Sequence, residues 1–447
     1  MKWFALIVGL GSIAPIALLL RRYTWLAPWL WTVVGFLPFV LTSWHLNMAP
    51  ISKPEWPGHV TGLEISALDF LVLALFLGSP GFKRSYPFLL SMVLYVLALA
   101  VSTALAPFPT VAFFHFWEML RVLLLAAVLA RGCADPRVAP AVLFGLALGL
   151  GLQFFVCLSQ RASGVIQTTG TLSHQNMLGL ISNAVAILFF GVFMARPALS
   201  KSAILPLLGM AIATMTASRG AMLFFLLGCV VVFVVSYIRM PTGRKTLVAV
   251  VGVTLAAVGV MFAMASFEQR FAAAPLDGTY DERAAFEKAA GMMIRDYPFG
   301  IGDNHYTFIA NVKGYSDNAG VAAIEGSRSA KVHNVFLLTW AETGYLGLAT
   351  FLFMLFQPVV TALRCGWRHR DDLRGDLLLG AGIALLTTYV HSFFEWIFIA
   401  NEPQYVFAMI CGLIAGVAQQ LNYWPACTKP AQLATPSRLL QPQATPA

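Results

Sequence analysis

The sequence predicts an all-α protein that crosses a membrane many times. Of its 447 residues, 59% are hydrophobic and only 11% are charged, and the mean hydropathy is +0.76. A soluble globular domain carries about 25% charged residues. The apolar residues also lie in runs of roughly 17 to 25 residues, the length at which a helix spans a bilayer.

Thirteen such runs follow one another along the chain. Gly9, Gly11 and Pro15 interrupt the first, so an interfacial or anchor-like segment is the alternative to a span there. The runs occupy residues 3–20, 25–44, 63–80, 85–106, 111–130, 138–158, 177–195, 202–217, 220–238, 246–266, 334–363, 376–399 and 403–421. We therefore expect transmembrane helices over 1–266 and 334–423, one large loop over 267–333, and a disordered tail over 424–447, which is rich in Pro, Ala, Gln and Thr.

The positive charges predict the orientation. Loops that hold an excess of Lys and Arg stay on the cytoplasmic side. Alternate loops and the tail carry Arg21, Arg22, Lys83, Arg84, Arg131, Arg137, Arg196, Lys201, Arg239, Arg244, Lys245, Arg364, Arg368, Arg370, Arg374, Lys429 and Arg438. The opposite loops, 45–62, 159–176, 217–220 and 267–333, then face the periplasm of a bacterium. The net charge of +9 reports this topology and does not indicate nucleic-acid binding.

The segment 267–333 is the one long connection, and loops of that length are usually functional. Its "DERAAFEKAAGMMIRDYP" predicts an amphipathic helix, capped by Asp281, with an apolar stripe of Phe286, Ala290 and Met293. Arg283 is a candidate ligand-binding arginine. It lies four residues before Glu287, so a surface salt bridge between the two would explain its presence equally well. "PFGIGDNHY" predicts a glycine-rich turn that can bring backbone close to a ligand.

His333 is the candidate general base. With Asn334 it stands at the expected start of a span, where the helix dipole opposes the charged imidazole. A solvated interfacial histidine is the plain alternative. Arg219, in "TASRGAML", falls at a tight outer turn, where it either faces a ligand or extends to the lipid headgroups.

Other polar residues on the same side can contact a substrate. His174 and Asn176 precede the span at 177, although Ser173 capping that helix is as good an explanation. His391 and Glu395 are expected four apart on one helix face, in contact with substrate or with each other. The further candidates are Arg161, Arg328, Lys331 and Asn334. Glu118 and Arg121 are expected to form an ion pair inside a span, with a structural role.

Several chemistries are absent from the sequence. There is no Walker A loop, HExxH motif, outer-face DxD motif or Ser-centred elbow. The six cysteines show no CxxC spacing, so neither a disulfide framework nor a zinc site is expected. We expect no cofactor. Arginines with a neutral histidine beside an apolar segment suit a lipid-linked anionic substrate, because guanidinium groups bind pyrophosphate without a metal.

The chain resembles the superfamily of O-antigen ligases, O-antigen polymerases and bacterial protein O-oligosaccharyltransferases. The resemblance covers roughly residues 165–400 and rests on "GTLSHQNMLG", "ASRGA", "RAAFEKAAGMMIRDYPFGIGDNHY" and "HNVFLLTWAETGYLGL". It implies a GT-C-like fold of about 12 transmembrane helices with a periplasmic loop that contains short helices. It also implies that Arg219 and Arg283 hold undecaprenyl pyrophosphate, that His333 is the base, and that the reaction inverts at the anomeric carbon.

Within that superfamily the ligase is favoured, because the chain shows neither a further arginine-bearing outer loop nor extra C-terminal domain sequence. A ligase in the bacterial inner membrane would transfer O-polysaccharide to a hydroxyl of lipid A-core at the periplasmic face. The alternatives are a polymerase or a protein-directed transferase. A flippase or secondary transporter fits less well, since no inverted repeat is apparent.

Overall fold

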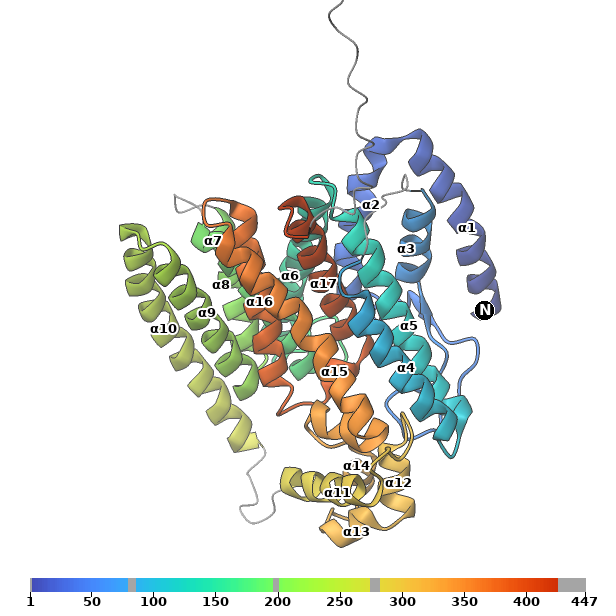
Figure 1. Cartoon of the computed structure of the whole chain (residues 1–447). Helices are drawn as coiled ribbons and strands as arrows, with labels where there is room; N and C mark the ends of the chain where they lie inside the picture. The colour runs from blue at the N-terminus through green and yellow to red at the C-terminus, as the bar shows by residue number, and fades with distance from the viewer. Residues whose placement is uncertain (1, 79–85, 196–200, 274–281, 425–447) are drawn as a thin grey trace, which may run out of the picture.

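The computed structural model describes residues 2–78, 86–195, 201–273 and 282–424, which form a bundle of antiparallel helices (Figure 1). The elements before the long loop are α1 (Lys2–Arg22), η1 (Thr24–Leu26), α2 (Ala27–Phe36), η2 (Leu37–Phe39), β1 (Asn47–Met48), β2 (Ile65–Ser66), α3 (Ala67–Gly78), α4 (Leu89–Leu105), α5 (Pro109–Gly132), α6 (Val138–Ala162), α7 (Gln175–Ala195), η3 (Lys201–Ala203), α8 (Ile204–Met215), α9 (Arg219–Arg239) and α10 (Gly243–Ala273). The others are α11 (Glu282–Asp296), α12 (Tyr306–Val312), α13 (Tyr315–Ala319), α14 (Glu325–Ser329), α15 (Val335–Arg368), α16 (Leu373–His391), η4 (Ile397–Ile399) and α17 (Asn401–Gln420).

The protein is a multi-pass, predominantly α-helical membrane protein. By length and hydropathy, eight helices of the described chain can cross a membrane: α1, α5, α6, α7, α9, α10, α15 and α16. Shorter apolar helices cover Thr24–Phe39, Ala67–Gly78, Leu89–Leu105 and Ile204–Met215. Each of the thirteen predicted runs overlaps a helix, the last of them α17. The sequence suggested that Gly9, Gly11 and Pro15 interrupt the first run. In the structure, helix α1 covers this run and continues without a break through Pro15.

The connections separate by charge between the two ends of the bundle (Figure 1). Helices α11 to α14 lie at one end, which we call the loop end, together with the connections 163–174, 216–218 and 392–400. The connections that follow α5, α9 and α15 lie at the opposite end. Arg and Lys gather in these connections and in the helix ends around them: Arg131, Arg137, Arg239, Arg244, Lys245, Arg368, Arg370 and Arg374. This alternation is the one that the charge pattern predicts.

Helix α7 forms the centre of the bundle and packs against α16, α9 and α8. Small residues allow this close packing. A Cβ atom at Gly191 of α7 would lie 2.6 Å from the Cα atom of Gly380 in α16. The backbones of α7 and α16 therefore touch. This packing fixes the position of α16 beside α7.

The expected ion pair between Glu118 and Arg121 is wrong. Arg121 Nη2 lies 2.9 Å from Oδ2 of Asp69 in α3, and Tyr405 of α17 accepts from the same guanidinium. No hydrogen-bond partner in the described chain reaches Oε1 of Glu118. Residues three apart on a helix share a face, but a charge inside a bundle pairs with whichever opposite charge a neighbouring helix brings to it.

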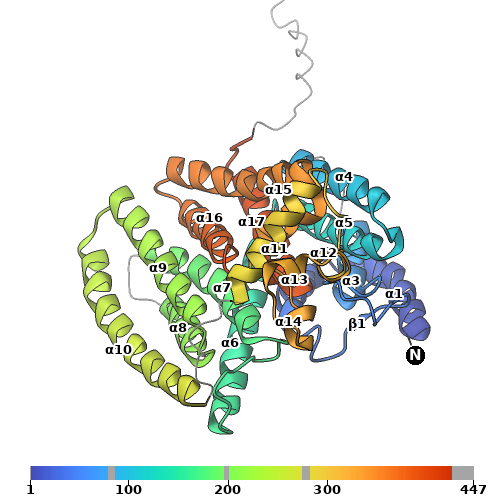
Figure 2. The same cartoon turned by 90° about the horizontal axis from the view of Figure 1, so that it is seen from below.

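Helix α11 lies across the loop end of the bundle (Figure 2). Its predicted apolar stripe is confirmed, since Phe286, Ala290 and Met293 are all buried. Asp281, the expected cap, lies outside the described residues. Helix α10 runs to Ala273, several residues past the predicted boundary at 266.

The glycine-rich turn packs on α15 instead of presenting its backbone to a ligand. Helix α15 is kinked at Gly344, whose φ is 68°. A Cβ at Gly344 would lie 2.5 Å from the carbonyl oxygen of Pro298, and one at Gly300 would lie 2.4 Å from that of Glu342. The amide of Ile301 donates to the Ala341 carbonyl at 2.9 Å. The kink of α15 therefore leaves room for this turn. Glycine is required both at Gly300 and at Gly344.

Candidate functional site

Glu395 lies at the centre of a polar site at the loop end. Helix α16 ends at His391, and Glu395 follows it in the connection to η4. The prediction that His391 and Glu395 share a helix face is therefore wrong. The amide of Val335 donates to the carbonyl of Ser392 at 3.0 Å, which ties this connection to the start of α15.

Three side chains from distant segments converge on the Glu395 carboxylate. Asn176 Nδ2 donates to Oε1 at 2.7 Å, and Arg283 Nη2 lies 3.4 Å from the same oxygen. His333 Nδ1 lies 3.4 Å from Oε2. Glu395 is buried, with 6% of its side chain exposed, whereas 27% of His333 and 54% of Arg283 are exposed. We call Glu395, Asn176, Arg283 and His333 the Glu395 cluster.

Helix α11 and the cap of α15 position the two exposed members. The Phe286 ring of α11 lies 6.1 Å from the His333 ring, and Arg283 is one turn earlier on that helix. Asn334 is the N-cap of α15, and its side-chain oxygen accepts from the amides of Phe336 and Leu337 at 3.0 and 3.1 Å. Asn334 was a candidate substrate contact; in the structure its oxygen fixes the helix start beside His333.

Arg219 lies next to this cluster at the start of α9. Ser218 caps α9 by accepting from the amide of Ala221. A Cβ at Gly220 would lie 3.0 Å from Nε2 of His391. Arg219 itself is exposed. His391 is close enough to Glu395 and Arg283 to experience both charges, so the first turn of α9 and the cluster border the same space.

Residues 204–352 match the family model described as O-antigen ligase. This match supports assigning the protein to the O-antigen ligase family. The matched segment is about a third of the chain and contains Arg219, Arg283 and His333. A search of curated proteins returns no match.

The match to the O-antigen ligase model implies a glycosyltransferase-type enzyme of lipopolysaccharide biosynthesis. Two members of the cluster, Asn176 and Glu395, lie outside the matched segment. The structure thus joins the ligase-family segment to the helices on either side of it in one site.

His174 orients Asn176. Its Nδ1 accepts from the Asn176 amide at 3.1 Å, so His174, and not Ser173, caps the first turn of α7. Desolvation lowers the pKa of His174, and the neighbouring His333 adds to this effect while Glu395 opposes it. The neutral imidazole, which can accept this hydrogen bond, is therefore the favoured form at neutral pH.

The structure does not bring Arg161, Arg328 and Lys331 to the Glu395 carboxylate. Arg161, in the last turn of α6, donates from Nη1 to the carbonyl of Ile166 at 2.5 Å. Arg328 Nη2 lies 2.6 Å from Oδ1 of Asp317 and holds α14 to α13. Lys331 Nζ lies 5.0 Å from the ring centre of Trp396, and burial lowers the pKa of this lysine. These contacts hold the loop end together.

His391 is buried and stacks on Phe224 of α9, with ring centres 4.6 Å apart. This contact, like the close approach of Gly220, makes His391 a packing residue between α16 and α9. It holds the start of α9, and therefore Arg219, against the cluster.

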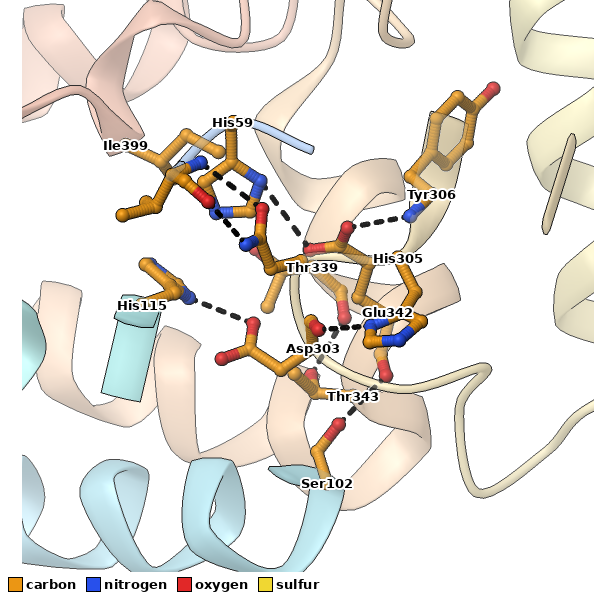
Figure 3. Close-up of polar contacts among 12 residues, drawn as sticks. His59, Ser102, His115, Asp303, His305, Tyr306, Thr339, Glu342, Thr343 and Ile399 are labelled. Atoms are coloured by element: carbon orange, nitrogen blue, oxygen red, sulfur yellow. Dashed lines mark hydrogen bonds and ion pairs between the residues drawn. The ribbon is translucent and has the colours of Figure 1, made fainter. Parts of the chain in front are cut away.

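Sequence reasoning missed a second buried group at the loop end. His59, His115 and Asp303 offer ligand atoms that all lie within 4.8 Å of one another (Figure 3). The three residues come from the connection before α3, from α5 and from the glycine-rich turn. No spacing in the sequence connects them, and only the folded chain brings them together.

Proposed function

We propose that the protein is an O-antigen ligase that transfers O-polysaccharide from undecaprenyl pyrophosphate to a sugar hydroxyl of lipid A-core. The observation that carries this proposal is the Glu395 cluster. It joins an accessible imidazole, an accessible guanidinium and a buried carboxylate at the loop end, beside Arg219.

Arg283 and Arg219 would bind the donor pyrophosphate. Guanidinium groups bind phosphate oxygens in bidentate pairs and stay charged at every physiological pH. The contact of Arg283 with Glu395 is long at 3.4 Å, and more than half of its side chain is exposed. The guanidinium can therefore turn toward a pyrophosphate while the Glu395 carboxylate remains held by Asn176.

His333 would act as the general base. With the proton on Nδ1 directed at Glu395, the lone pair on Nε2 is free to accept a proton from the acceptor hydroxyl. The hydroxyl oxygen attacks the anomeric carbon, the bond between that carbon and the phosphate oxygen breaks, and undecaprenyl pyrophosphate leaves with the electron pair. One displacement inverts the anomeric centre. Glu395 stabilises the imidazolium that forms, and the arginines stabilise the leaving group.

An apolar groove between α8, α9 and α10 can hold the polyprenyl chain. Met210, Phe225, Leu226 and Val251 are among the residues that line it. Helix α9 leads from Arg219 at the loop end to Phe225 in this groove, so a pyrophosphate at Arg219 would place its lipid tail on the membrane-facing side of α9. This arrangement supports a lipid-linked donor.

The charge distribution supports a site that faces the periplasm of the inner membrane. The helix ends and connections that hold most of the Arg and Lys residues lie at the end opposite the Glu395 cluster (Figure 1), and segments of this kind remain in the cytoplasm. ATP is absent from the periplasm, so the energy of the transfer would come from the pyrophosphate linkage. The proposed transfer requires no metal or other cofactor and no nucleic acid; its partners are the donor lipid, lipid A-core and the bilayer.

A chromosomal deletion tests the proposal. A ligase deletion should remove long-chain lipopolysaccharide while lipid-linked polymer of normal length accumulates, and the wild-type gene should restore the product where the His333→Ala gene does not. Accumulation of single lipid-linked repeat units would instead identify a polymerase. Loss of periplasmic lipid-linked sugar altogether would identify a flippase.

A further inference from the structure

A second group of ionisable side chains is buried at the loop end, apart from the Glu395 cluster. Figure 3 shows the His59 ring facing Glu342 and the His115 ring facing Asp303. His115 Nδ1 lies 2.7 Å from Oδ1 of Asp303, and His59 Nδ1 lies 4.0 Å from Oε2 of Glu342. Each of the four side chains is at most 4% exposed. We call these four residues the two-histidine group.

Hydrogen bonds within the protein leave part of this group unsatisfied. Within the described ranges, no partner reaches Nε2 of His59, Nε2 of His115 or Oδ2 of Asp303. Burying such atoms without a partner is unfavourable. The other contacts are well defined: the amide of Tyr306 donates to Oε1 of Glu342 at 2.8 Å, which directs Oε2 toward His59. The group therefore offers nitrogen and oxygen lone pairs that the protein alone does not use.

We propose that the two-histidine group is a structural binding site for a divalent transition metal ion of the zinc type. Two imidazoles and two carboxylates form a ligand set that Zn²⁺ accepts in tetrahedral geometry. With metal–ligand bonds of about 2.0–2.2 Å, adjacent ligand atoms lie about 3.3 Å apart. The 2.7 Å and 4.0 Å separations lie on either side of this value, and ligand atoms of His59, His115 and Asp303 lie within 4.8 Å of one another. The side chains would therefore have to move closer together to coordinate an ion.

The charges of the group also favour a cation. A divalent ion would supply positive charge beside the two buried carboxylates of Asp303 and Glu342.

The ion would hold four separate segments together. His59 comes from the connection before α3, His115 from α5, Asp303 from the glycine-rich turn, and Glu342 from the helix just before the α15 kink. That turn and that kink pack on each other, and α15 begins beside His333. The ion would stabilise the frame that carries the Glu395 cluster and would take no part in the transfer itself.

Metal analysis of the full-length protein in detergent tests this proposal without a transfer assay. After equilibration with Zn²⁺ and removal of free ion, the wild-type protein should retain about one zinc per chain. Zn²⁺ should also raise the unfolding temperature. Asp303→Asn, which keeps the shape of the side chain, should lose the ion and this thermal shift. His45→Gln, in an exposed histidine outside the group, should keep both.

Co²⁺ gives a second readout that needs no variant. Co²⁺ bound by the two-histidine group of the wild-type protein should show the intense visible absorption of tetrahedral coordination, and Zn²⁺ should displace it. Wild-type protein that retains no zinc and shows no such absorption would overturn the proposal, as would equal zinc in Asp303→Asn. If zinc binds but His333→Ala transfers sugar normally, only the proposed function fails.

Discussion

Glu395 Oε2 lies 3.4 Å from Nδ1 of His333, although 62 positions separate the two residues. The carboxylate is buried and the imidazole is partly exposed. In the proposed mechanism, this contact would let the carboxylate orient the general base and stabilise its protonated form. We therefore propose a positioning role for Glu395.

Glu395→Gln tests this role. The amide cannot stabilise the imidazolium, so kcat should fall by about 10²-fold or more, while KM for the lipid-linked donor changes much less. Steady-state transfer rates measure both quantities. Glu287→Gln, in an exposed carboxylate of α11, should leave them unchanged. A Glu395→Gln enzyme with normal kcat would show that the contact with His333 is structural.

Arg283→Ala tests the donor site. Removing a charge-assisted contact worth about 1.5–3 kcal/mol should weaken donor binding by roughly 10- to 100-fold. Arg283→Lys should restore only part of this loss, because an ammonium group lacks the bidentate geometry. Arg295→Ala, in an exposed arginine at the other end of α11, is the matched control. Equal donor affinity in Arg283→Ala and Arg295→Ala would remove Arg283 from the site.

The sequence predicted the helices well because each apolar run is a local signal. It predicted the surroundings of the charged residues poorly. Arg121 pairs with Asp69 and not with Glu118, and Glu395 lies beyond the end of α16. Both errors come from assuming that near neighbours in sequence share a helix face, whereas the pairing of buried charges is decided by helices from elsewhere in the chain.

His174→Asn tests a pH effect. The pKa of His174 is lowered, so the group gains its proton only below its usual value near 6.5. Protonation converts Nδ1 from acceptor to donor, which breaks the bond from the Asn176 amide and loosens Asn176 from Glu395. Asparagine accepts that bond at every pH.

Protonation of His174 should therefore lower activity on the acid side. In a plot of log(kcat/KM) against pH from about 5 to 8, the wild-type protein should lose more activity at the acid end than His174→Asn. Identical acid limbs in the two proteins would show that His174 does not control the site.

Gly344→Ala tests the kink of α15. The residue has a φ of 68°, and a Cβ would lie 2.5 Å from the Pro298 carbonyl. The substitution should destabilise the protein by about 1–3 kcal/mol or more and lower its unfolding temperature in detergent. Gly291→Ala, at a helical position of α11 where a Cβ meets nothing within 4 Å, should be neutral or stabilising. Similar unfolding temperatures for the two variants would mean that the turn and the kink do not depend on each other.

The glycine-rich turn also explains why the two-histidine group was not predicted from the sequence. The glycines of "PFGIGDNHY" predict a turn, but Asp303 becomes a candidate ligand only beside His115 of α5 and His59, which lies in a connection without a motif. When each ligand comes from a different segment, no characteristic spacing appears in the sequence. His333 and Arg283 were candidates from the sequence because the short motifs around them resemble those of the ligase superfamily.

We propose that this protein joins a lipid-linked polysaccharide to a second lipid at the Glu395 cluster. Reconstitution provides the decisive experiment: purified protein is mixed with polyprenyl-pyrophosphate-linked O-polysaccharide and lipid A-core, without ATP, and the products are analysed on a gel. Ligated lipopolysaccharide and an equal amount of free polyprenyl pyrophosphate should form, and His333→Ala should yield neither product. Lengthening of the lipid-linked polysaccharide without transfer to lipid A-core would show that the protein is not a ligase.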